Sequence, residues 1–225
     1  VLAGLELAVP VWAETTGRTS WHPGHIAERY GLFTLIVLGE SVLAATVAVQ
    51  VALDGTTPFA DLAPVVVGGI LTVFFMWWMY FDMPAEQAVG RIRQGLVDRP
   101  SGPFIWGYGH YLVFASAAAV GAGLAVAVDQ VTHHSKLSET EAGFALTVPV
   151  TIFIAAVWVL HFRHKVPGFM RSYAVPVAGA LILASSLTPE PVLATGILLA
   201  ALIAASVIGN CLRPRPAPSE AISRD

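Results

Sequence analysis

Long apolar runs separated by short polar segments make up most of the sequence. A helix that crosses a bilayer needs about 20 apolar residues. Runs of this kind predict six complete spans, at residues 31–53, 63–81, 104–128, 142–162, 172–187 and 192–212. The end of a further span precedes them at residues 7–13. Strands are not expected, because no stretch alternates apolar and polar residues. The pattern predicts an all-α, polytopic transmembrane helical bundle over residues 1–212, followed by a disordered, proline-rich tail at 213–225.

The composition supports the bilayer as the main solvent of this chain. Hydrophobic residues make up 56% of the sequence and charged residues 12%, whereas an ordinary soluble domain has about 25% charged residues. The mean hydropathy is +0.70. The formal net charge of −3 gives no general attraction to nucleic acid, so no such partner is expected. One cysteine, Cys211, excludes an internal disulfide.

The basic residues sort to one side of the predicted spans. If the spans alternate in direction, eleven of the twelve basic residues fall on one side, and Lys136 alone falls on the other. The positive-inside rule makes the basic side cytoplasmic, which places the C-terminus in the cytoplasm. The sequence begins at Val1 inside an apolar run, so we expect the chain to be a fragment that lacks an N-terminal part.

Glu40 is the acidic residue that the pattern places deepest in a complete span. It lies roughly 15 Å from the cytoplasmic end at about 1.5 Å per residue, where a charged carboxylate costs at least about 2.5–3.5 kcal/mol. We therefore expect Glu40 to face the bundle interior as a proton or cation site, or else to be a neutral group hydrogen-bonded to a neighbouring helix. Helical periodicity places His25, Arg29, Ile36 and Glu40 on one face of the same helix, where they form a polar stripe. The alternative is that His25 and Arg29 are interfacial anchors.

Two further polar residues approach the same half of the bundle. Asp82 ends the second span, and His110 lies six residues into the third, so both start from the cytoplasmic side. We expect them to converge with Arg29, and His110 is suited to relay protons near neutral pH. The alternatives are a helix cap for Asp82 and a packed imidazole for His110.

Other conspicuous residues receive structural interpretations. Aromatic residues at the end of the second span predict an interfacial belt formed by Trp77, Trp78, Tyr80 and Phe81. Small residues four apart predict close helix packing in two rows, Ala115, Ala119 and Gly123, and Gly196, Ala200 and Ala204. His161 and His164 lie beside basic residues and are expected in a loop that contacts water or lipid headgroups.

No motif points to a cofactor or to a reaction. A cluster of potential ligands at His22, His25 and Glu28 lacks a strong metal-binding spacing, so neither a metal nor another cofactor is expected. A phosphate loop, a nucleophile elbow and a paired-cysteine motif are all missing from the sequence. We therefore expect a protein that is not an enzyme.

Three stretches resemble the bacterial low temperature requirement A (LtrA) proteins. They are HIAERYGLFTLIVLGES from His25 to Ser41, WWMYFD from Trp77 to Asp82, and GYGHY from Gly107 to Tyr111. The resemblance implies a polytopic protein of the bacterial inner membrane, belonging to a family named for a cold-growth phenotype. It also implies that this chain is the C-terminal half, with the missing N-terminal half as a partner. It supplies no reaction.

Two functions follow as hypotheses. The first is a proton- or cation-coupled transporter or channel, with candidate site residues Glu40, Arg29, His110, Asp82, His25 and Glu28. In it, Glu40 holds the proton or ion at mid-membrane, Arg29 tunes the site or binds an anion, and His110 and Asp82 relay protons. The alternative is a membrane sensor or scaffold in cold or stress adaptation that moves no solute. The expected partners are the lipid bilayer, a proton or small cation and, in one version, a second copy in a homo-oligomer.

Overall fold

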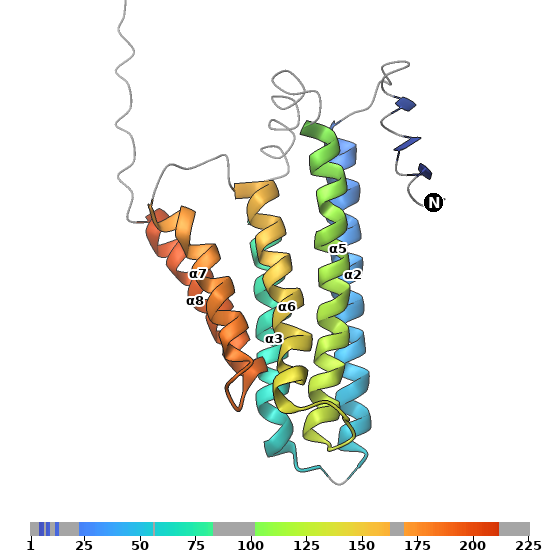
Figure 1. The fold of residues 1–225 in the computed structure, drawn as a ribbon, viewed down its shortest axis with the longest axis vertical. Coiled ribbons are helices and arrows are strands. Elements are labelled where there is room, and N and C mark those ends of the chain that lie inside the picture. Colours follow the sequence, from blue (N-terminus) through green and yellow to red (C-terminus); the bar gives the residue numbers. More distant parts are fainter. Residues whose placement is uncertain are drawn as a thin grey trace, which may run out of the picture.

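The residues that the structure describes fold entirely into helices and short connections. This computed structural model describes residues 5–6, 8–9, 12–13, 23–55, 57–82, 102–162 and 169–211. The helices lie side by side along the long axis of the molecule (Figure 1). They are α2 (Pro23–Leu53), α3 (Phe59–Phe81), α5 (Gly102–Val131), α6 (Glu139–Val157), the π-helical segment η1 (Trp158–Phe162), α7 (Phe169–Ser185) and α8 (Pro191–Cys211). The predicted all-α class is confirmed for this part of the chain.

Five of these helices are long and apolar enough to cross a membrane. They are α2, α3, α5, α6 continued by η1, and α8. Helix α7 is also apolar, but it has 17 residues and is shorter than the others. Its assignment as a sixth span stays a prediction. Residues 7, 10 and 11 of the partial span at 7–13, and the whole tail at 213–225, lie outside the described residues.

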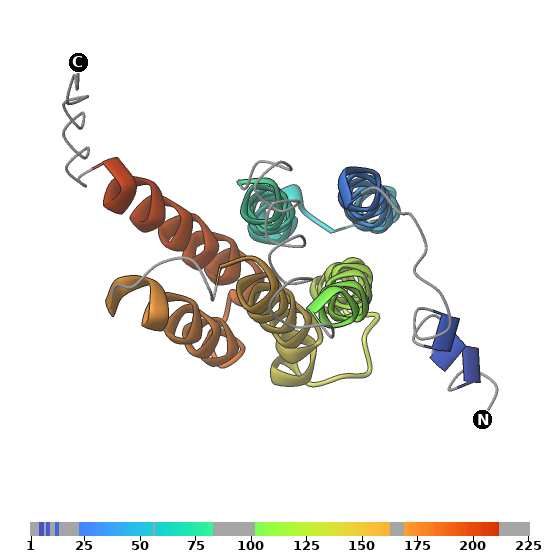
Figure 2. The ribbon, with the colours of Figure 1, turned by 90° about the horizontal axis from the view of Figure 1, so that it is seen from above.

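The helices pack in an order that differs from their order along the chain. Helix α5 lies against both α2 and α6, whereas α3 packs mainly against α8, which comes last in the sequence. Helix α7 joins α6 and α8 on one side of the bundle (Figure 2). The side of α2 that points away from α3 and α5 is left without a neighbouring helix among the described elements.

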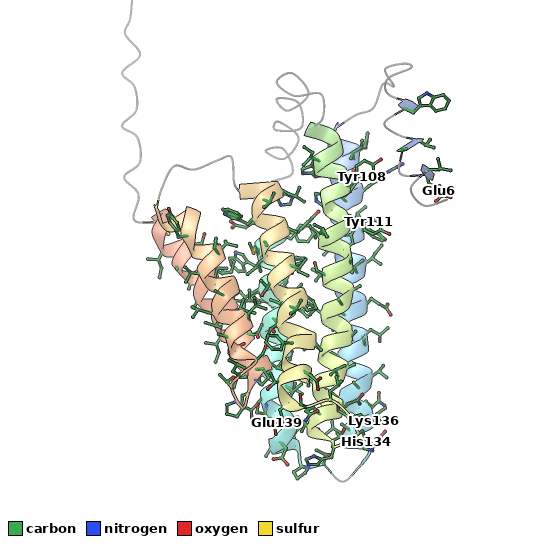
Figure 3. All side chains as sticks on the ribbon, in the orientation of Figure 1. Glu6, Tyr108, Tyr111, His134, Lys136 and Glu139 are labelled. Atoms are coloured by element: carbon green, nitrogen blue, oxygen red, sulfur yellow. The ribbon has the colours of Figure 1, made fainter. Side chains whose placement is uncertain are left out.

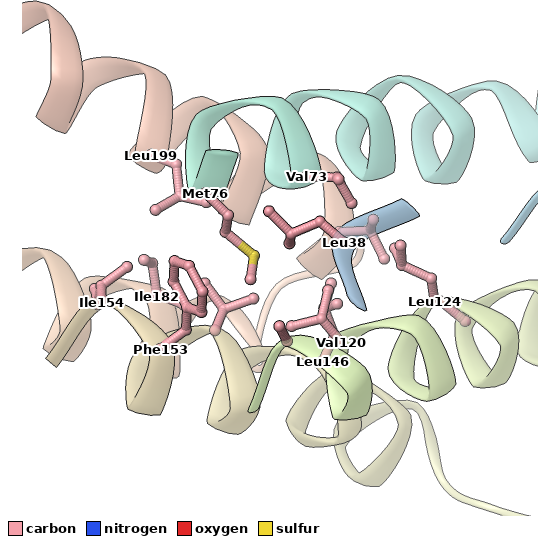
Figure 4. Packing of buried hydrophobic residues seen from close by; sticks show 14 of the residues in the cluster. Leu38, Val73, Met76, Val120, Leu124, Leu146, Phe153, Ile154, Ile182 and Leu199 are labelled. Carbon is pink, nitrogen blue, oxygen red and sulfur yellow. The ribbon is translucent and has the colours of Figure 1, made fainter. Parts of the chain in front are cut away.

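A continuous set of buried apolar side chains joins the helices (Figure 4). Met76 of α3 and Phe153 of α6 have no exposed surface, and Leu38 of α2 is almost fully buried. In a bilayer, lipid is as apolar as these side chains, so close van der Waals packing and interhelical hydrogen bonds hold the bundle together.

Glycines allow the closest helix contacts. A Cβ atom at Gly68 of α3 would lie 2.5 Å from the backbone nitrogen of Leu193 in α8, and one at Gly196 would lie 2.8 Å from the Gly68 carbonyl oxygen. Gly123 of α5 approaches α6 in the same way. The predicted packing role of the small-residue rows is therefore confirmed at Gly123 and Gly196.

The contact at Gly123 also covers a carbonyl group that proline leaves free. Pro149 inside α6 has no N–H group, so the carbonyl of Ala145 loses its usual donor four residues later. A Cβ atom at Gly123 would lie 2.5 Å from that carbonyl oxygen. Only glycine at this position lets α5 cover the freed carbonyl, which lipid tails cannot satisfy.

A buried pair of hydroxyl groups links α6 to the end of α7. Thr147 Oγ1 lies 2.6 Å from Ser186 Oγ, and both residues are buried. Thr147→Val keeps the shape of the side chain and removes this hydrogen bond, so we expect a loss of about 0.6 kcal/mol, and at most ~1.7 kcal/mol, in the free energy of unfolding. A double-mutant cycle with Ser186→Ala measures the coupling, and strictly additive losses would contradict the bond.

Candidate functional site

His110 is a histidine of α5 that is fully enclosed in the bundle. It is the sixth residue of an apolar span, about 8 Å from its start, and has no exposed surface. Its Nδ1 atom lies 2.8 Å from the carbonyl oxygen of Trp106. A carbonyl oxygen only accepts, so in the neutral ring Nδ1 carries the hydrogen and Nε2 is left as an acceptor. Nε2 is buried and has no hydrogen-bond partner among the described residues.

Rings from four helical elements surround His110. The distances between ring centroids are 4.8 Å to Tyr30 of α2, 4.2 Å to Trp106 of α5, 5.9 Å to Tyr80 of α3 and 5.5 Å to His161 of η1. Together with the buried Thr34 of α2, these residues form what we call the His110 cluster: Tyr30, Thr34, Tyr80, Trp106, His110 and His161. It lies near the end of the bundle where Figure 3 labels Tyr108 and Tyr111, which flank His110 in the sequence.

A line of hydroxyl groups joins α3 to α2 beside His110. Tyr80 is buried and shares a side-chain hydrogen bond with Thr34. Thr34 Oγ1 donates to the carbonyl oxygen of Tyr30 over 2.9 Å. The single hydrogen of Thr34 is therefore committed to that carbonyl, so its oxygen accepts from the Tyr80 hydroxyl. This arrangement fixes the position of Tyr80 against His110 and His161.

His161 belongs to an irregular stretch of helix. Helix α6 widens into a π-helical segment at Trp158–Phe162, and such segments are rare and occur frequently at functional sites. His161 is 7% exposed, and its ring lies 5.2 Å from that of Tyr80. The bundle therefore places two imidazoles next to each other at one end.

Two glycines that precede His110 make room for the cluster. A Cβ atom at Gly107 would lie 3.2 Å from the Tyr30 hydroxyl oxygen, and one at Gly109 would lie 2.6 Å from Leu160 Cδ2 in η1. Larger residues at these positions would force the side chains of Tyr30 and Leu160 to shift.

Most of the candidates from the sequence lie elsewhere. His25, Arg29, Ile36 and Glu40 lie along one face of α2 as predicted. His25 Nδ1 lies 3.8 Å from Oε2 of Glu28, which belongs to a neighbouring side of the helix. This face is exposed, so the expectation that Glu40 points into the bundle is wrong. The physical reason is helical phase, because Leu38 faces the core and two residues turn the helix by about 200°.

The predicted convergence at the cytoplasmic half is also wrong in part. Asp82 directly follows α3 and is exposed, and no ion pair joins it to Arg29 within the described ranges. The two residues therefore remain candidates by position only. His110 alone, among the six candidates, belongs to the buried cluster.

For two members of the cluster, the structure corrects the position expected from the sequence. His161 was expected in a loop because basic residues follow it, but it is buried at the end of the α6–η1 helix. Tyr80 was expected in an aromatic belt together with Trp77 and Trp78, which are 39% and 37% exposed, but it is 6% exposed. Its spacing of four residues from the fully buried Met76 is the signal that places it on the core face.

The three sequence stretches meet at this cluster. The first contributes Tyr30, the second contributes Tyr80, and the third contributes His110. Within the ranges that the structure describes, no three histidine, cysteine, aspartate or glutamate side chains gather where a metal ion would bind. The chemistry available is exchange of a proton at an imidazole surrounded by aromatic rings and hydroxyl groups.

The fold and its apolar helices define a polytopic helical membrane protein. The family described as "Bacterial low temperature requirement A protein (LtrA)" matches residues 1–208, so the chain belongs to this family. It is 25% identical over 178 residues to an uncharacterised protein of Rhizobium meliloti (strain 1021), a match that covers 76% of this chain and 39% of the relative. The chain thus spans well under half the length of that relative. No solved structure matches it.

Proposed function

We propose that this protein is a proton-coupled transporter or channel in which His110 carries the proton. The observation that supports the proposal is the buried Nε2 atom of His110, an acceptor without a hydrogen-bond partner among the described residues. Leaving a buried polar atom unsatisfied costs about 1–3 kcal/mol. A neutral histidine ring takes up a proton at the nitrogen that lacks a hydrogen, so Nε2 is the atom of His110 that would take up a proton during a transport cycle.

Aromatic rings and hydroxyl groups form the immediate surroundings of His110. The ring centroids of Tyr30 and Trp106 lie 4.8 Å and 4.2 Å from that of His110, within the range over which aromatic rings interact with a cation. The titratable side chains that face His110 are Tyr30, Tyr80 and His161. In our proposal, His161 is the second proton-carrying group. The proton leaves Nε2 of His110, either for the neighbouring imidazole or for an intervening water.

The basic residues of the sequence give the proposal an orientation. In a bacterial inner membrane with the basic side inward, the C-terminus and the end of α6 that carries His161 face the cytoplasm. The His110 cluster would then exchange protons with the cytoplasm. Lys136, which Figure 3 labels at the opposite end of the bundle, would lie outside.

Proton flux into liposomes tests this function. The protein is reconstituted into vesicles that contain a pH-sensitive dye, and a membrane potential drives proton entry. We expect flux with the parent protein and background flux with His110→Gln, since an amide does not take up a proton in this pH range. His134→Gln is the matched control, because His134 is exposed at the other end of the bundle. If His110→Gln conducts like the parent protein, His110 is not the proton carrier.

A second function, a sensor or scaffold that moves no solute, is favoured by the exposed polar residues on α2. In this case a change in the protonation of His110 alters helix packing and thereby a contact with another protein. The same vesicles distinguish the two functions. A sensor shows no flux in the parent protein, and its thermal stability depends on pH in a way that His110→Gln removes.

A further inference from the structure

The outward face of α2 is the least covered surface of the bundle. Only 17% of its apolar window is buried, compared with 22% in α8, 39% in α3 and 50% in α5. Ile36, Leu43 and Val47 on this face are 65%, 55% and 50% exposed. Lipid tails would cover apolar side chains of this kind without any further partner.

Glu40 shows that lipid alone does not suit this face. It lies 17 residues after the first residue of α2 and 13 before the last, and it is exposed. It makes no hydrogen bond or ion pair with any residue in the described ranges. A carboxylate at this depth costs at least about 2.5–3.5 kcal/mol in contact with hydrocarbon. The face therefore calls for a covering group that hydrogen-bonds.

The exposed residues around Glu40 have the spacing of a helix-pairing seam. They follow one another at intervals of three and four residues, the pattern by which two helices pack at a shallow angle. We call them the Glu40 stripe: Phe33, Ile36, Glu40, Leu43, Val47 and Gln50, all of them exposed. Beside the stripe, nothing lies within 4 Å of the position that a Cβ atom would take at Gly39, so another helix backbone can approach there.

We propose that the Glu40 stripe is the surface through which two copies of this chain pair in the membrane. Two copies inserted in the same direction place Glu40 at the same depth in each, and a twofold axis brings the same residues together. A protonated carboxyl group has one donor and one acceptor, so two of them satisfy each other. The amide of Gln50 has the same property ten residues further on, nearly three helical turns away.

This complementarity favours a second copy over other occupants. A different membrane helix would need a hydrogen-bonding group opposite Glu40 and another opposite Gln50, whereas an identical chain supplies both. A polar residue at one seam position also fixes the register of a helix pair. The pairing is separate from the proposed proton transport, because Glu40 and its stripe neighbours Leu43 and Val47 lie on the side of α2 away from the buried Thr34 and Leu38, and only Phe33 at one end of the stripe reaches a ring of α5, that of Phe114.

Cross-linking of single-cysteine variants in native membranes tests the pairing. Cys211 is exposed and is first replaced by serine. Leu43→Cys then places a thiol on the stripe, and Ile70→Cys places a matched thiol on the exposed face of α3, where Ile70 is 65% exposed. Under mild oxidation we expect a product of twice the chain mass from Leu43→Cys and little from Ile70→Cys.

Variants of Glu40 in the Leu43→Cys background test the carboxyl pair. An interhelical polar pair worth about 1 kcal/mol corresponds to about a fivefold change in the dimer equilibrium. Glu40→Ala should lower the dimer population by about this factor, measured as energy transfer between labelled copies at increasing lipid dilution. Glu40→Gln should retain the dimer, because an amide also donates and accepts.

Each of the other outcomes overturns the proposal. Equal cross-linking of Leu43→Cys and Ile70→Cys means that the copies collide at random and the stripe faces lipid. A product whose mass is not twice that of the chain means that a different protein covers the stripe. Dimers that form equally well with Glu40→Ala mean that the carboxyl pair does not hold the two copies together.

Discussion

Gly68→Ala is expected to destabilise the protein by about 1–3 kcal/mol, the usual range for overpacking, or more. The added Cβ atom would lie 2.5 Å from the backbone nitrogen of Leu193 and from the carbonyl carbon and oxygen of Val192. Backbone atoms cannot rotate away as a side chain can, so α3 and α8 must separate. Separation of the two helices also disturbs the contact of Gly196 in α8 with Gly68. Thermal unfolding of the protein in detergent measures the loss.

Gly209→Ala is the matched control for this prediction. Gly209 also lies in α8, but a Cβ atom there would meet nothing within 4 Å. Alanine is favoured over glycine inside a helix by up to about 1 kcal/mol, so this variant should be neutral or slightly more stable. Equal losses from Gly68→Ala and Gly209→Ala would show that helix propensity, and not the α3–α8 contact, determines the result.

His110→Phe is expected to abolish proton flux while leaving the melting temperature unchanged or higher. Phenylalanine fills nearly the same space among the rings of Tyr30, Trp106 and His161. It removes an Nε2 atom that has no hydrogen-bond partner among the described residues, so little stabilisation is lost. The carbonyl of Trp106 loses a donor but still lies within the α5 helix. A residue whose removal stops function without loss of stability is retained for function.

His110→Ala separates this effect from packing. Truncation of a fully buried ring leaves a cavity, for which a loss of about 3–5 kcal/mol is typical of aromatic side chains. We therefore expect a large drop in melting temperature for His110→Ala and little change for His110→Phe. Comparable losses for the two variants would mean that Nε2 has a partner that stabilises the folded protein.

The extent of the helices follows from the sequence because hydrocarbon sets their length and composition. The predicted spans differ from the observed helices by a few residues at most ends. The exception is α2, which begins eight residues earlier, at Pro23 instead of residue 31. Proline suits the first turn of a helix, and a polar stretch at the membrane surface can be helical without being apolar. Apolarity therefore locates the membrane segment and not the helix end.

The direction in which polar residues face could not be deduced in the same way. Depth selected both His110 and Glu40, yet His110 is enclosed and Glu40 is exposed. Both helices are apolar on nearly every side, so hydropathy shows no difference between the core face and the outer face. His161 was missed because the basic residues that follow it suggested a surface position, although the predicted span at 142–162 already included it.

The pairing of α3 with α8 has a consequence for biosynthesis. The two helices are separated in the chain by α5, α6 and α7, and more than a hundred residues lie between Phe81 and Pro191. While the ribosome synthesises that stretch, the surface of α3 around Gly68 has no α8 to pack against. A polypeptide that stops before Pro191 therefore leaves the Gly68 side of α3 without the helix that packs on it in the complete bundle.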